Sequence, residues 1–572
     1  MSTDLHGLSR RNALKLAGAA GLVAVYPGRI SFASATKEYA IAVEAGRIVV
    51  DGIESNAVMM GGSVPAPTLR WREGEEVTIQ ATNRLKESTS IHWHGLLLDG
   101  DMDGAPGFNG FAPIPPGETF TYRFKLRQSG TYWYHSHSGL QEQAGMYGGI
   151  VIEPRGRDPV RADRDYVVAL SDHTQEDPMR VMAKLKANAG YYNRGKRTLV
   201  DFFRDADRDG FGAALKDRLE WGEMRMDPTD LADVTGYAFL VNGKGPRDNW
   251  TALFKPGERV RLRFINASAM SFFDVRIPGL PMTVVAADGQ NVQPVRVDEF
   301  RFGVGETYDV IVLPREDKAF TVFAEPIDRS GYARATLAPR EGMEGAIPEQ
   351  RPRTILSMAD MGAAHAGMDH SAMGHGAMGQ GGAMSGMDHS KMSMPGMDHS
   401  AMGHGAMPTT QDASGKRPFG WADAATPPGQ KALAYADLRS AAKNADAREP
   451  SQEIEVRLTG IMDRYMWNLN GRPFGKEEPI RVKYGERVRI KFVNETMMAH
   501  PMHLHGMFVE VENGQTDRRP LKHVVVVPPG QEVSALLTAD EPGDWPFHCH
   551  LMYHMASGMM TRFIVGPKGA ST

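Results

Sequence analysis

The residues between His548 and Met559 combine a thiol, imidazoles and a thioether within a short distance. Cys549 is the only cysteine of the 572-residue chain, and His548 and His550 flank it. His554 follows five residues after the cysteine and Met559 ten residues after it. Two imidazoles, one thiolate and a weak axial thioether are the ligands of a blue-copper electron-transfer site. The stretch therefore predicts such a site, with one of its two histidines supplied from elsewhere.

The missing histidine is expected from the segment 500–505, which has histidines at positions 500, 503 and 505. We assign His500 to the thiolate site. The alternative is that a lone cysteine is a small buried apolar residue. That alternative fits a cysteine among valines and leucines better than one between two histidines, so we interpret Cys549 as a ligand.

Two histidine motifs occur twice, once near the start of the chain and once near its end. His92–Gly95 matches His503–Gly506, and Gly130–His137 matches Gly543–His550. One His-x-His pair is often a chance event, but four pairs in matched contexts are not. The motifs predict a metal cluster of eight histidines, which are His92, His94, His135, His137, His503, His505, His548 and His550.

The two copies differ where the thiolate site is expected. At the positions of His500, Cys549 and His554 in the later copy, the earlier copy has Thr89, Ser136 and Gln141. We therefore expect one thiolate site, in the later copy alone, and a histidine cluster to which both copies contribute equally.

The alternation of side chains along a strand explains a cysteine between two histidines. Residues i and i+2 of a strand face one side and residue i+1 faces the other. His548 and His550 can then hold copper behind the copper at Cys549, and electrons have a short covalent route between the two. Eight imidazoles suit three copper ions, held by three, three and two. Together with the thiolate site this gives four one-electron centres, which match the four electrons that reduce O2 to water.

An acidic run from Asp99 to Asp103 follows the first histidine pair. It lies close enough to supply a carboxylate relay for the protons that O2 reduction consumes. We interpret Asp99 and Asp101 as solvated turn residues, which leaves Asp103 as the candidate catalytic acid.

A separate pattern, Gly-Glu-x-Val-x-(Ile/Leu)-x-(Ala/Phe)-x-Asn, occurs at Gly74–Asn83, Gly257–Asn266 and Gly485–Asn494. Its alternation of apolar and polar residues predicts a half-buried strand. Three copies along the chain predict three similar β domains, each a sandwich or a barrel.

The region between residues 160 and 235 is charged, and Pro178–Asn188 has helical character. Asp205–Gly210 begins like a calcium loop, but the twelfth position is Lys216 instead of the bidentate glutamate that such a loop requires. We therefore predict a polar turn at Asp205–Gly210 and no calcium site.

The first 35 residues have the features of a secretory signal. Arg10 and Arg11 precede an apolar run from Leu16 to Tyr26, and the segment 33–35 has the small-x-small pattern of a cleavage site. The arginine pair indicates the twin-arginine route to the bacterial periplasm. The apolar run is too short to span a bilayer. A free thiol is liable to oxidation in such a compartment, which favours a metal-bound cysteine.

Residues 359–430 differ in composition from the rest of the chain. Met368–Met378 recurs unchanged as Met397–Met407, with the shorter copy Met387–Met392 between them. Glycine, serine and alanine fill the gaps, so the segment cannot bury enough apolar surface to fold, and we expect it to be disordered. A plain tether between domains is the alternative. Because thioethers and imidazoles are copper ligands, we interpret the segment as a copper-capture insertion.

Taken in order, the four histidine motifs resemble the copper signatures of the multicopper oxidases. The resemblance covers nearly all of the chain after residue 35. It implies an all-β fold of three cupredoxin-like Greek-key β-barrel domains, at residues 36–157, 158–345 and 431–572. It also implies an oxidoreductase with four copper ions, one of type 1, one of type 2 and two of type 3.

By motif position, the resemblance assigns each ligand to one type of copper. The type 1 ligands are expected to be His500, Cys549, His554 and Met559. The type 2 ligands are expected to be His92 and His503, and the type 3 ligands His94, His135, His137, His505, His548 and His550. Asp103 stands where the family places a proton-relay acid.

The signal sequence and the Met-Asp-His-Ser repeats look like those of the bacterial copper-resistance protein A group, which resembles periplasmic cuprous oxidases. The resemblance implies oxidation of Cu(I) with O2 as the second substrate. Met498 fits a substrate-side methionine near His500. Thr496 stands where an acid is expected, and Glu495 is the candidate replacement. Met555 stands where some cuprous oxidases have an acid for proton delivery.

Two other functions stay open at this point. One is a laccase-like oxidase of phenols or of other metal ions, with the Met/His-rich insertion as a bystander. The other is a copper-sequestering protein without turnover, against which the complete set of ligands argues. The formal net charge of −4 gives no indication of nucleic-acid binding. We expect a periplasmic monomer with no membrane span in the mature chain.

Overall fold

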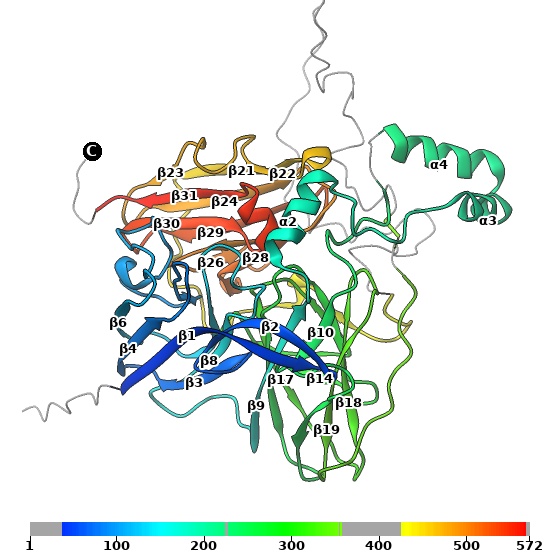
Figure 1. Cartoon of the computed structure of the whole chain (residues 1–572). Coiled ribbons are helices and arrows are strands. Elements are labelled where there is room, and N and C mark those ends of the chain that lie inside the picture. Colours follow the sequence, from blue (N-terminus) through cyan, green and yellow to red (C-terminus); the bar gives the residue numbers. More distant parts are fainter. Residues whose placement is uncertain (1–36, 224–226, 354, 357–424, 568–572) are drawn as a thin grey trace, which may run out of the picture. The chain divides into compact units, whose positions relative to one another are not determined.

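The computed structural model describes residues 37–223, 227–353, 355–356 and 425–567 (Figure 1). The predicted signal peptide lies outside these residues, as does the Met/His-rich insertion with its predicted disorder, apart from residues 425–430. The described residues form six sheets and few helices, which confirms the predicted all-β class.

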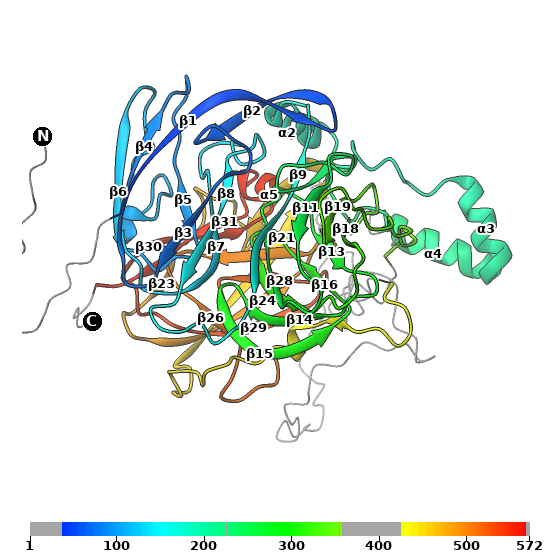
Figure 2. The same ribbon diagram turned by 90° about the horizontal axis from the view of Figure 1, so that it is seen from below.

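The six sheets form three pairs in chain order (Figures 1 and 2). The first pair has the strand orders β2-β1-β4-β6 and β3-β8-β7-β5. Its strands are β1 (Lys37–Val50), β2 (Ile53–Met60), β3 (Ala66–Arg72), β4 (Glu76–Asn83), β5 (His92–His94), β6 (Thr119–Lys125), β7 (Gly130–His135) and β8 (Tyr147–Glu153).

The second pair has the strand orders β10-β9-β12-β17-β14-β15 and β11-β19-β18-β13-β16-β20. Its strands are β9 (Arg164–His173), β10 (Ala238–Val241), β11 (Trp250–Leu253), β12 (Val260–Asn266), β13 (Phe273–Arg276), β14 (Met282–Ala287), β15 (Gln290–Val297), β16 (Glu299–Phe302), β17 (Thr307–Val312), β18 (Phe320–Pro326), β19 (Ala333–Ala338) and β20 (Ala432–Leu433).

The third pair has the strand orders β22-β21-β24-β29-β26-β27 and β23-β31-β30-β25-β28. Its strands are β21 (Gln452–Ile461), β22 (Met466–Leu469), β23 (Ile480–Val482), β24 (Arg487–Asn494), β25 (His500–Leu504), β26 (Val509–Val511), β27 (Leu521–Lys522), β28 (Val524–Val527), β29 (Glu532–Thr538), β30 (Gly543–Cys549) and β31 (Met560–Val565). One apolar core joins the second and third pairs, and a separate core fills the first pair.

The three repeated segments form equivalent strands, β4, β12 and β24, and each pairs in parallel with the first strand of its own sheet. Each ends at a buried asparagine, Asn83, Asn266 or Asn494, whose amide donates to a backbone carbonyl in the loop that follows and to a second carbonyl farther along the chain. Each such hydrogen bond contributes about 1 kcal/mol. The asparagine of the repeat therefore fixes the loops from which the histidine strands β5 and β25 begin.

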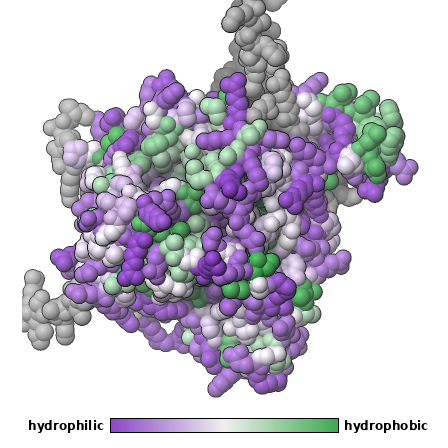
Figure 3. Space-filling model, viewed as in Figure 1, coloured by the Kyte–Doolittle hydropathy of each residue, from purple (hydrophilic) through white to green (hydrophobic). Residues whose placement is uncertain are grey.

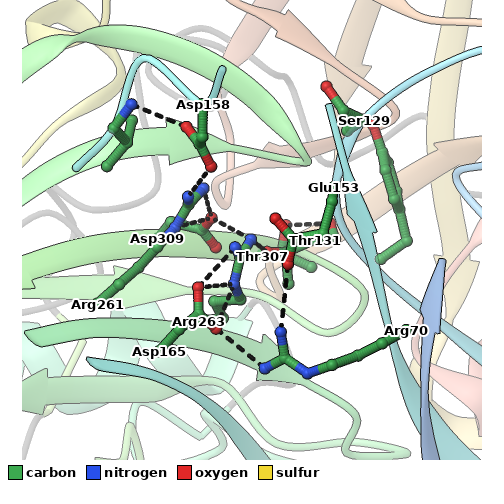
Figure 4. A network of polar contacts seen from close by, with 12 residues as sticks. Arg70, Ser129, Thr131, Glu153, Asp158, Asp165, Arg261, Arg263, Thr307 and Asp309 are labelled. Carbon is green, nitrogen blue, oxygen red and sulfur yellow. Dashed lines mark hydrogen bonds and ion pairs between the residues drawn. The ribbon is translucent and has the colours of Figure 1, made fainter. Parts of the chain in front are cut away.

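β12 departs from the half-buried pattern, because all of its residues are buried. Its arginines lie at the contact between the first and second pairs of sheets. Arg263 donates to Asp165 (2.8 Å) and to Thr131 of β7 (2.9 Å), and Arg261 and Arg263 both donate to Asp309 (Figure 4). The hydrogen bond from Arg263 to Thr131 joins the two pairs of sheets, and the ion pairs with Asp165 and Asp309 hold the Arg263 side chain in place for it.

Four helices accompany the described strands, and they are α2 (Pro178–Ala187), α3 (Leu199–Asp209), α4 (Phe211–Glu223) and α5 (Met552–Ala556). α2 confirms the helix expected at Pro178–Asn188. The polar turn expected at Asp205–Gly210 is wrong, because residues 205–209 form the end of α3. That helix begins with a capping box between Thr198 and Asp201, in which each side chain accepts from the other residue's backbone N–H.

α3 and α4 pack on each other and project away from the sheets (Figures 1 and 2). Apolar side chains gather on their outer face, as Figure 3 shows over these two helices. The exposed apolar residues of the two helices are Leu199, Val200, Phe203, Phe211, Leu215 and Leu219.

Candidate metal centres

The eight histidines expected to form a cluster lie together where the first and third pairs of sheets meet. Antiparallel pairing places His92 of β5 opposite His135 of β7, and His503 of β25 opposite His548 of β30. Rings from β5 stack on rings of the third pair, one in β25 and one directly after it. The ring centroids of His92 and His505 are 3.9 Å apart, and so are those of His94 and His503.

The ring nitrogens of this cluster form three compact groups, in each of which all ligand atoms lie within 4.8 Å of one another. The groups are His94 with His135 and His550, His137 with His505 and His548, and His92 with His503 and His505. Each group combines histidines from both ends of the chain. The cluster therefore exists only when the first and third pairs of sheets are in contact.

Hydrogen bonds orient most of these rings. The Nδ1 atoms of His92, His135, His503 and His548 lie 2.7–3.0 Å from backbone carbonyl oxygens, which can only accept, so each Nδ1 carries the proton. The Nε2 atoms of the first three rings are buried and have no partner among the described residues. Since buried polar atoms are normally paired, these nitrogens are a donor set that fits metal ions.

The Nε2 atoms of His505 and His548 also form a donor set that fits a metal ion. Nδ1 of His505 lies 2.8 Å from Oδ2 of Asp103, and Nδ1 of His548 lies 3.0 Å from the carbonyl oxygen of Cys549. The two Nε2 atoms, which then carry lone pairs, are 3.0 Å apart. Burial lowers the pKa of both rings, that of His548 to about 4. Both rings are therefore neutral, the state in which imidazole binds a metal ion.

The residues expected at the thiolate site also converge. Sγ of Cys549 lies 3.5 Å from Nδ1 of His500 and 3.8 Å from Nδ1 of His554, and the two Nδ1 atoms are 3.2 Å apart. Met559 is buried, and its carbonyl oxygen accepts from the Cys549 N–H. Burial raises the pKa of the Cys549 thiol. A bound cation is therefore needed to hold this sulfur as a thiolate.

Both imidazoles of the thiolate site have a partner at their outer nitrogen. Oγ1 of Thr496 lies 2.7 Å from Nε2 of His500, and Oδ2 of Asp233 lies 2.6 Å from Nε2 of His554. Tyr465 also donates to Asp233 (2.9 Å). An outer carboxylate fixes the tautomer and the orientation of a metal-binding histidine. Asp233 lies 321 residues from its partner in a loop before β10, and no motif in the sequence indicates it.

We expect the Asp233→Ala substitution to weaken copper binding at the thiolate site by about 10–100-fold, the usual cost of removing an outer partner of a ligand. The His554 ring loses the acceptor that holds its Nε2–H. Titration of the copper-free protein with Cu(II), followed by the blue absorption band, measures the affinity. Asp233→Asn keeps an acceptor oxygen and should retain most of the affinity. Equal affinities in the alanine variant and the wild type would contradict this role.

Asp103 contacts two histidines of the cluster. Its Oδ2 lies 2.8 Å from Nδ1 of His505, and its Oδ1 lies 3.4 Å from Nδ1 of His92. The next residue, Gly104, has φ +82°, and a Cβ there would lie 1.8 Å from the carbonyl oxygen of Ile91. Only glycine allows the loop to pass so close to β5, and this close approach places the carboxylate against the two rings.

Two further residues contact the cluster. Oε2 of Glu142 lies 2.7 Å from Nδ1 of His135, and burial together with the nearby Asp172 raises the pKa of the Glu142 carboxyl. The ring centroid of His523 lies 4.8 Å from that of His94, and its ring nitrogens make no hydrogen bond to described residues. Both residues occur singly in the sequence, so a search for paired motifs does not find them.

In the first copy, the residues that correspond to the ligands of the thiolate site form hydrogen bonds with one another. Thr89 and Ser136 both donate to Oε1 of Gln141, at 2.7 and 2.9 Å. The amide nitrogen of Gln141 donates to Glu87 and to the Ser88 carbonyl, at 3.0 Å each. The position is therefore a closed polar network without a thiol or an imidazole.

The two residues expected on the substrate side lie in different surroundings. Glu495 forms an ion pair with Arg457 in an exposed position. Met498 is buried, and its carbonyl oxygen accepts from the Thr496 hydroxyl (3.2 Å). Its neighbour Met497, which the sequence does not single out, lines a cavity.

Known proteins resemble this chain over most of its length. The multicopper oxidase family matches residues 42–157, 164–342 and 447–569. The chain is 46% identical over 546 residues to Copper resistance protein A of Escherichia coli, covering 89% of each protein. It is 49% identical over 555 residues to the Copper resistance protein A homolog of Pseudomonas syringae pv. tomato, covering 93% of each.

Solved structures show the same architecture. The laccase from Botrytis aclada has a TM-score of 0.64 at 21% identity, over 92% of this chain and 87% of that chain. The multicopper oxidase from Campylobacter jejuni, described as a metallo-oxidase, has a TM-score of 0.57 at 18% identity, over 93% and 92%. These likenesses concern the fold alone, and they confirm the expected cupredoxin-like architecture.

Proposed function

The chain belongs to the multicopper oxidase family, and from that premise we propose that it oxidises Cu(I) and reduces O2 to water. Its similarity to Copper resistance protein A indicates an oxidoreductase of the copper-resistance type. In the proposed reaction, four Cu(I) ions give up four electrons. One O2 takes these electrons with four protons and forms two molecules of water.

The position of Cys549 between two groups of ligands supports this proposal most. Its Sγ lies with His500 and His554, whereas its neighbours His548 and His550 belong to the histidine cluster. The path from the sulfur to either neighbouring imidazole runs through the covalent bonds of adjacent residues. An electron accepted at the thiolate therefore reaches the cluster without a step through space.

We also propose four copper ions in the sites that the motifs assign. Bound copper would supply reversible one-electron redox chemistry. The proposed type 1 ligands are His500, Cys549, His554 and Met559. The proposed type 2 ligands are His92 and His503, and the type 3 ligands are His94, His135, His137, His505, His548 and His550. The unpaired Nε2 atoms and the neutral rings support this set.

Asp103 is the proposed acid of the cluster. Its Oδ2 accepts from His505, and its Oδ1 is buried and makes no hydrogen bond to described residues. The free oxygen is the atom at which the side chain would hold a proton for O2 reduction.

We propose that the chain is exported to the periplasm by the twin-arginine route, because of Arg10 and Arg11, and that it acts as a monomer. Across the part of the chain that the structure describes, every helix is too short or too polar to cross a membrane.

Deletion of residues 365–407 tests the role of the Met/His-rich insertion. We expect kcat/KM for Cu(I) to fall by at least about tenfold, because a tethered set of ligands raises the local concentration of the ion. Oxidation of a phenolic dye should be unchanged, since the dye does not bind thioethers. O2 consumption measures both reactions. If Cu(I) turnover is unaffected by the deletion, the insertion does not capture substrate.

The same assay on the intact protein separates the competing functions. O2 consumption with the phenolic dye and none with Cu(I) would indicate a laccase-like enzyme. A copper-loaded protein that consumes no O2 with either reductant would indicate sequestration.

A further inference from the structure

His523 is a buried histidine between β27 and β28 that lies against the histidine cluster and belongs to none of its paired motifs. The centroid of its ring is 4.8 Å from that of His94 and 5.5 Å from that of His503. One nitrogen from each of these three rings lies within 4.8 Å of the other two. The three groups formed by the paired histidines meet the same distance. By its position, His523 is therefore a ninth imidazole of the cluster.

The ring of His523 lacks the partners that a buried imidazole normally has. Neither of its nitrogens makes a hydrogen bond to described residues. Oδ2 of Asp288 lies 4.0 Å from Nδ1, which is beyond hydrogen-bond distance, and accepts instead from the backbone N–H groups of His523 and Val524 (3.2 and 3.1 Å). Buried polar atoms are normally paired, so the unpaired nitrogens that face His94 and His503 indicate a ligand between the rings.

The surrounding chain holds the ring in this place. Gly95, directly after the histidine pair of β5, has φ +80°, and a Cβ there would lie 2.4 Å from Nε2 of His523. A larger residue at position 95 would therefore take the space of the ring. The ring of Phe508 lies on another side, with its centroid 5.4 Å away. The carbonyl oxygen of His523 lies 2.7 Å from Nδ1 of His503 and accepts from it. His523 thus orients His503 through its backbone and places its own ring beside it.

The number of imidazoles indicates which ion His523 would bind. Eight imidazoles hold three copper ions by three, three and two, and the ion with two is the one assigned to His92 and His503. His503 is also a member of the group that contains His523. A ninth imidazole at this place would give each of the three ions three imidazoles.

We propose that His523 is a ninth histidine ligand of the cluster and the third protein ligand of the copper ion held by His92 and His503. The inference rests on the proposed set of copper ions and adds to it a residue that the paired motifs do not contain. An ion with three imidazoles is retained more strongly than one with two, because a further bond must break before the ion leaves. His523 would therefore keep the cluster loaded when copper is scarce.

The first test compares His523→Leu and His523→Gln with the wild type, each as the full chain. Both substitutions remove the ring nitrogens and keep the backbone carbonyl that accepts from His503. We expect each variant to lose one copper ion at a chelator concentration at least about tenfold lower than the wild type, since loss of a ligand costs no less than loss of its outer partner. The EPR signal of the non-blue Cu(II) should disappear with that ion, and the blue absorption band should stay.

The second test counts the imidazoles on the non-blue Cu(II) by pulsed EPR, in which the outer nitrogen of each bound imidazole modulates the signal. We expect three imidazoles in the copper-loaded wild type. Either variant, when loaded at high copper concentration, should show two. This count does not depend on turnover.

His173→Gln is the matched control, because His173 at the end of β9 is buried and its Nε2 is also unpaired among described residues, but it belongs to none of the histidine groups. It should retain copper as the wild type does. A count of two imidazoles in the wild type would overturn the inference, even if the variants lose copper, because His523 would then be only an outer partner. Unchanged retention of copper in both variants would also overturn it. A wild type that shows three imidazoles but does not oxidise Cu(I) would support the inference and overturn the proposed function.

Discussion

The Cys549→Ser protein is expected to be colourless and to lose turnover with both Cu(I) and a phenolic dye. A serine hydroxyl stays protonated at neutral pH, so it does not replace the thiolate that lies with His500 and His554. The loss should exceed the roughly 100-fold that follows removal of an outer partner of a ligand, because a ligand itself is removed. Visible absorption and O2 consumption measure the two effects.

The fold should survive this substitution, because the exchange of sulfur for oxygen at one buried position has an expected cost of about 1 kcal/mol. Thermal unfolding of the copper-free proteins checks this. Ser136→Ala is the matched control, since Ser136 holds the corresponding position in the first copy and its hydroxyl makes hydrogen bonds to Gln141 and Ser138 alone among the described residues. It should keep both colour and turnover. An unfolded Cys549→Ser protein would instead indicate a structural thiol.

The Asp103→Ala protein is expected to keep its blue colour and to reduce O2 about 100-fold more slowly or worse, since two histidines lose their outer carboxylate. The carboxylate contacts His505 and His92 but no residue of the thiolate site. Anaerobic reduction with Cu(I) should therefore proceed, and the return of the blue colour after mixing with O2 should be slow. Stopped-flow absorption separates these two steps.

Asp101→Ala is the control for this experiment, because Asp101 is exposed and lies two residues away in the same acidic run. Asp103→Asn keeps an acceptor for His505 but does not transfer a proton. If Asp103 only positions the ring, the asparagine variant should reoxidise at the wild-type rate. If it also supplies protons, the asparagine variant should be slow as well. Rapid reoxidation of the alanine variant would exclude both roles.

Sequence patterns predicted the histidines and Cys549 because the chemistry of these sites depends on short, fixed spacings. A His-Cys-His tripeptide in a strand places the thiolate and the imidazoles on opposite sides of that strand. This arrangement is local and does not depend on the rest of the fold. The three repeated strands were predictable for a similar reason. Their alternation marks a buried face in β4 and β24, and the final asparagine is the residue that fixes the loops before β5 and β25.

The residues outside those patterns depend on contacts between distant parts of the chain. Asp233 meets His554 only because a loop of the second pair of sheets lies against the third pair. Glu495, which is next to Thr496 in the sequence, forms an ion pair with the exposed Arg457, a partner that no motif indicates. The spacing of aspartates at Asp205–Gly210 resembled a calcium loop, whereas the capping box upstream determines a helix there.

The hydrogen bonds among Thr89, Ser136 and Gln141 limit how electrons can reach the histidine cluster in the proposed reaction. Hydroxyl and amide groups do not change oxidation state, so this position does not serve as a second entry point for electrons. In the proposed reaction, all electrons therefore enter the cluster by way of Cys549. Each turnover requires four successive electron transfers from the thiolate site. The time needed to reduce that site again sets an upper bound on the turnover rate.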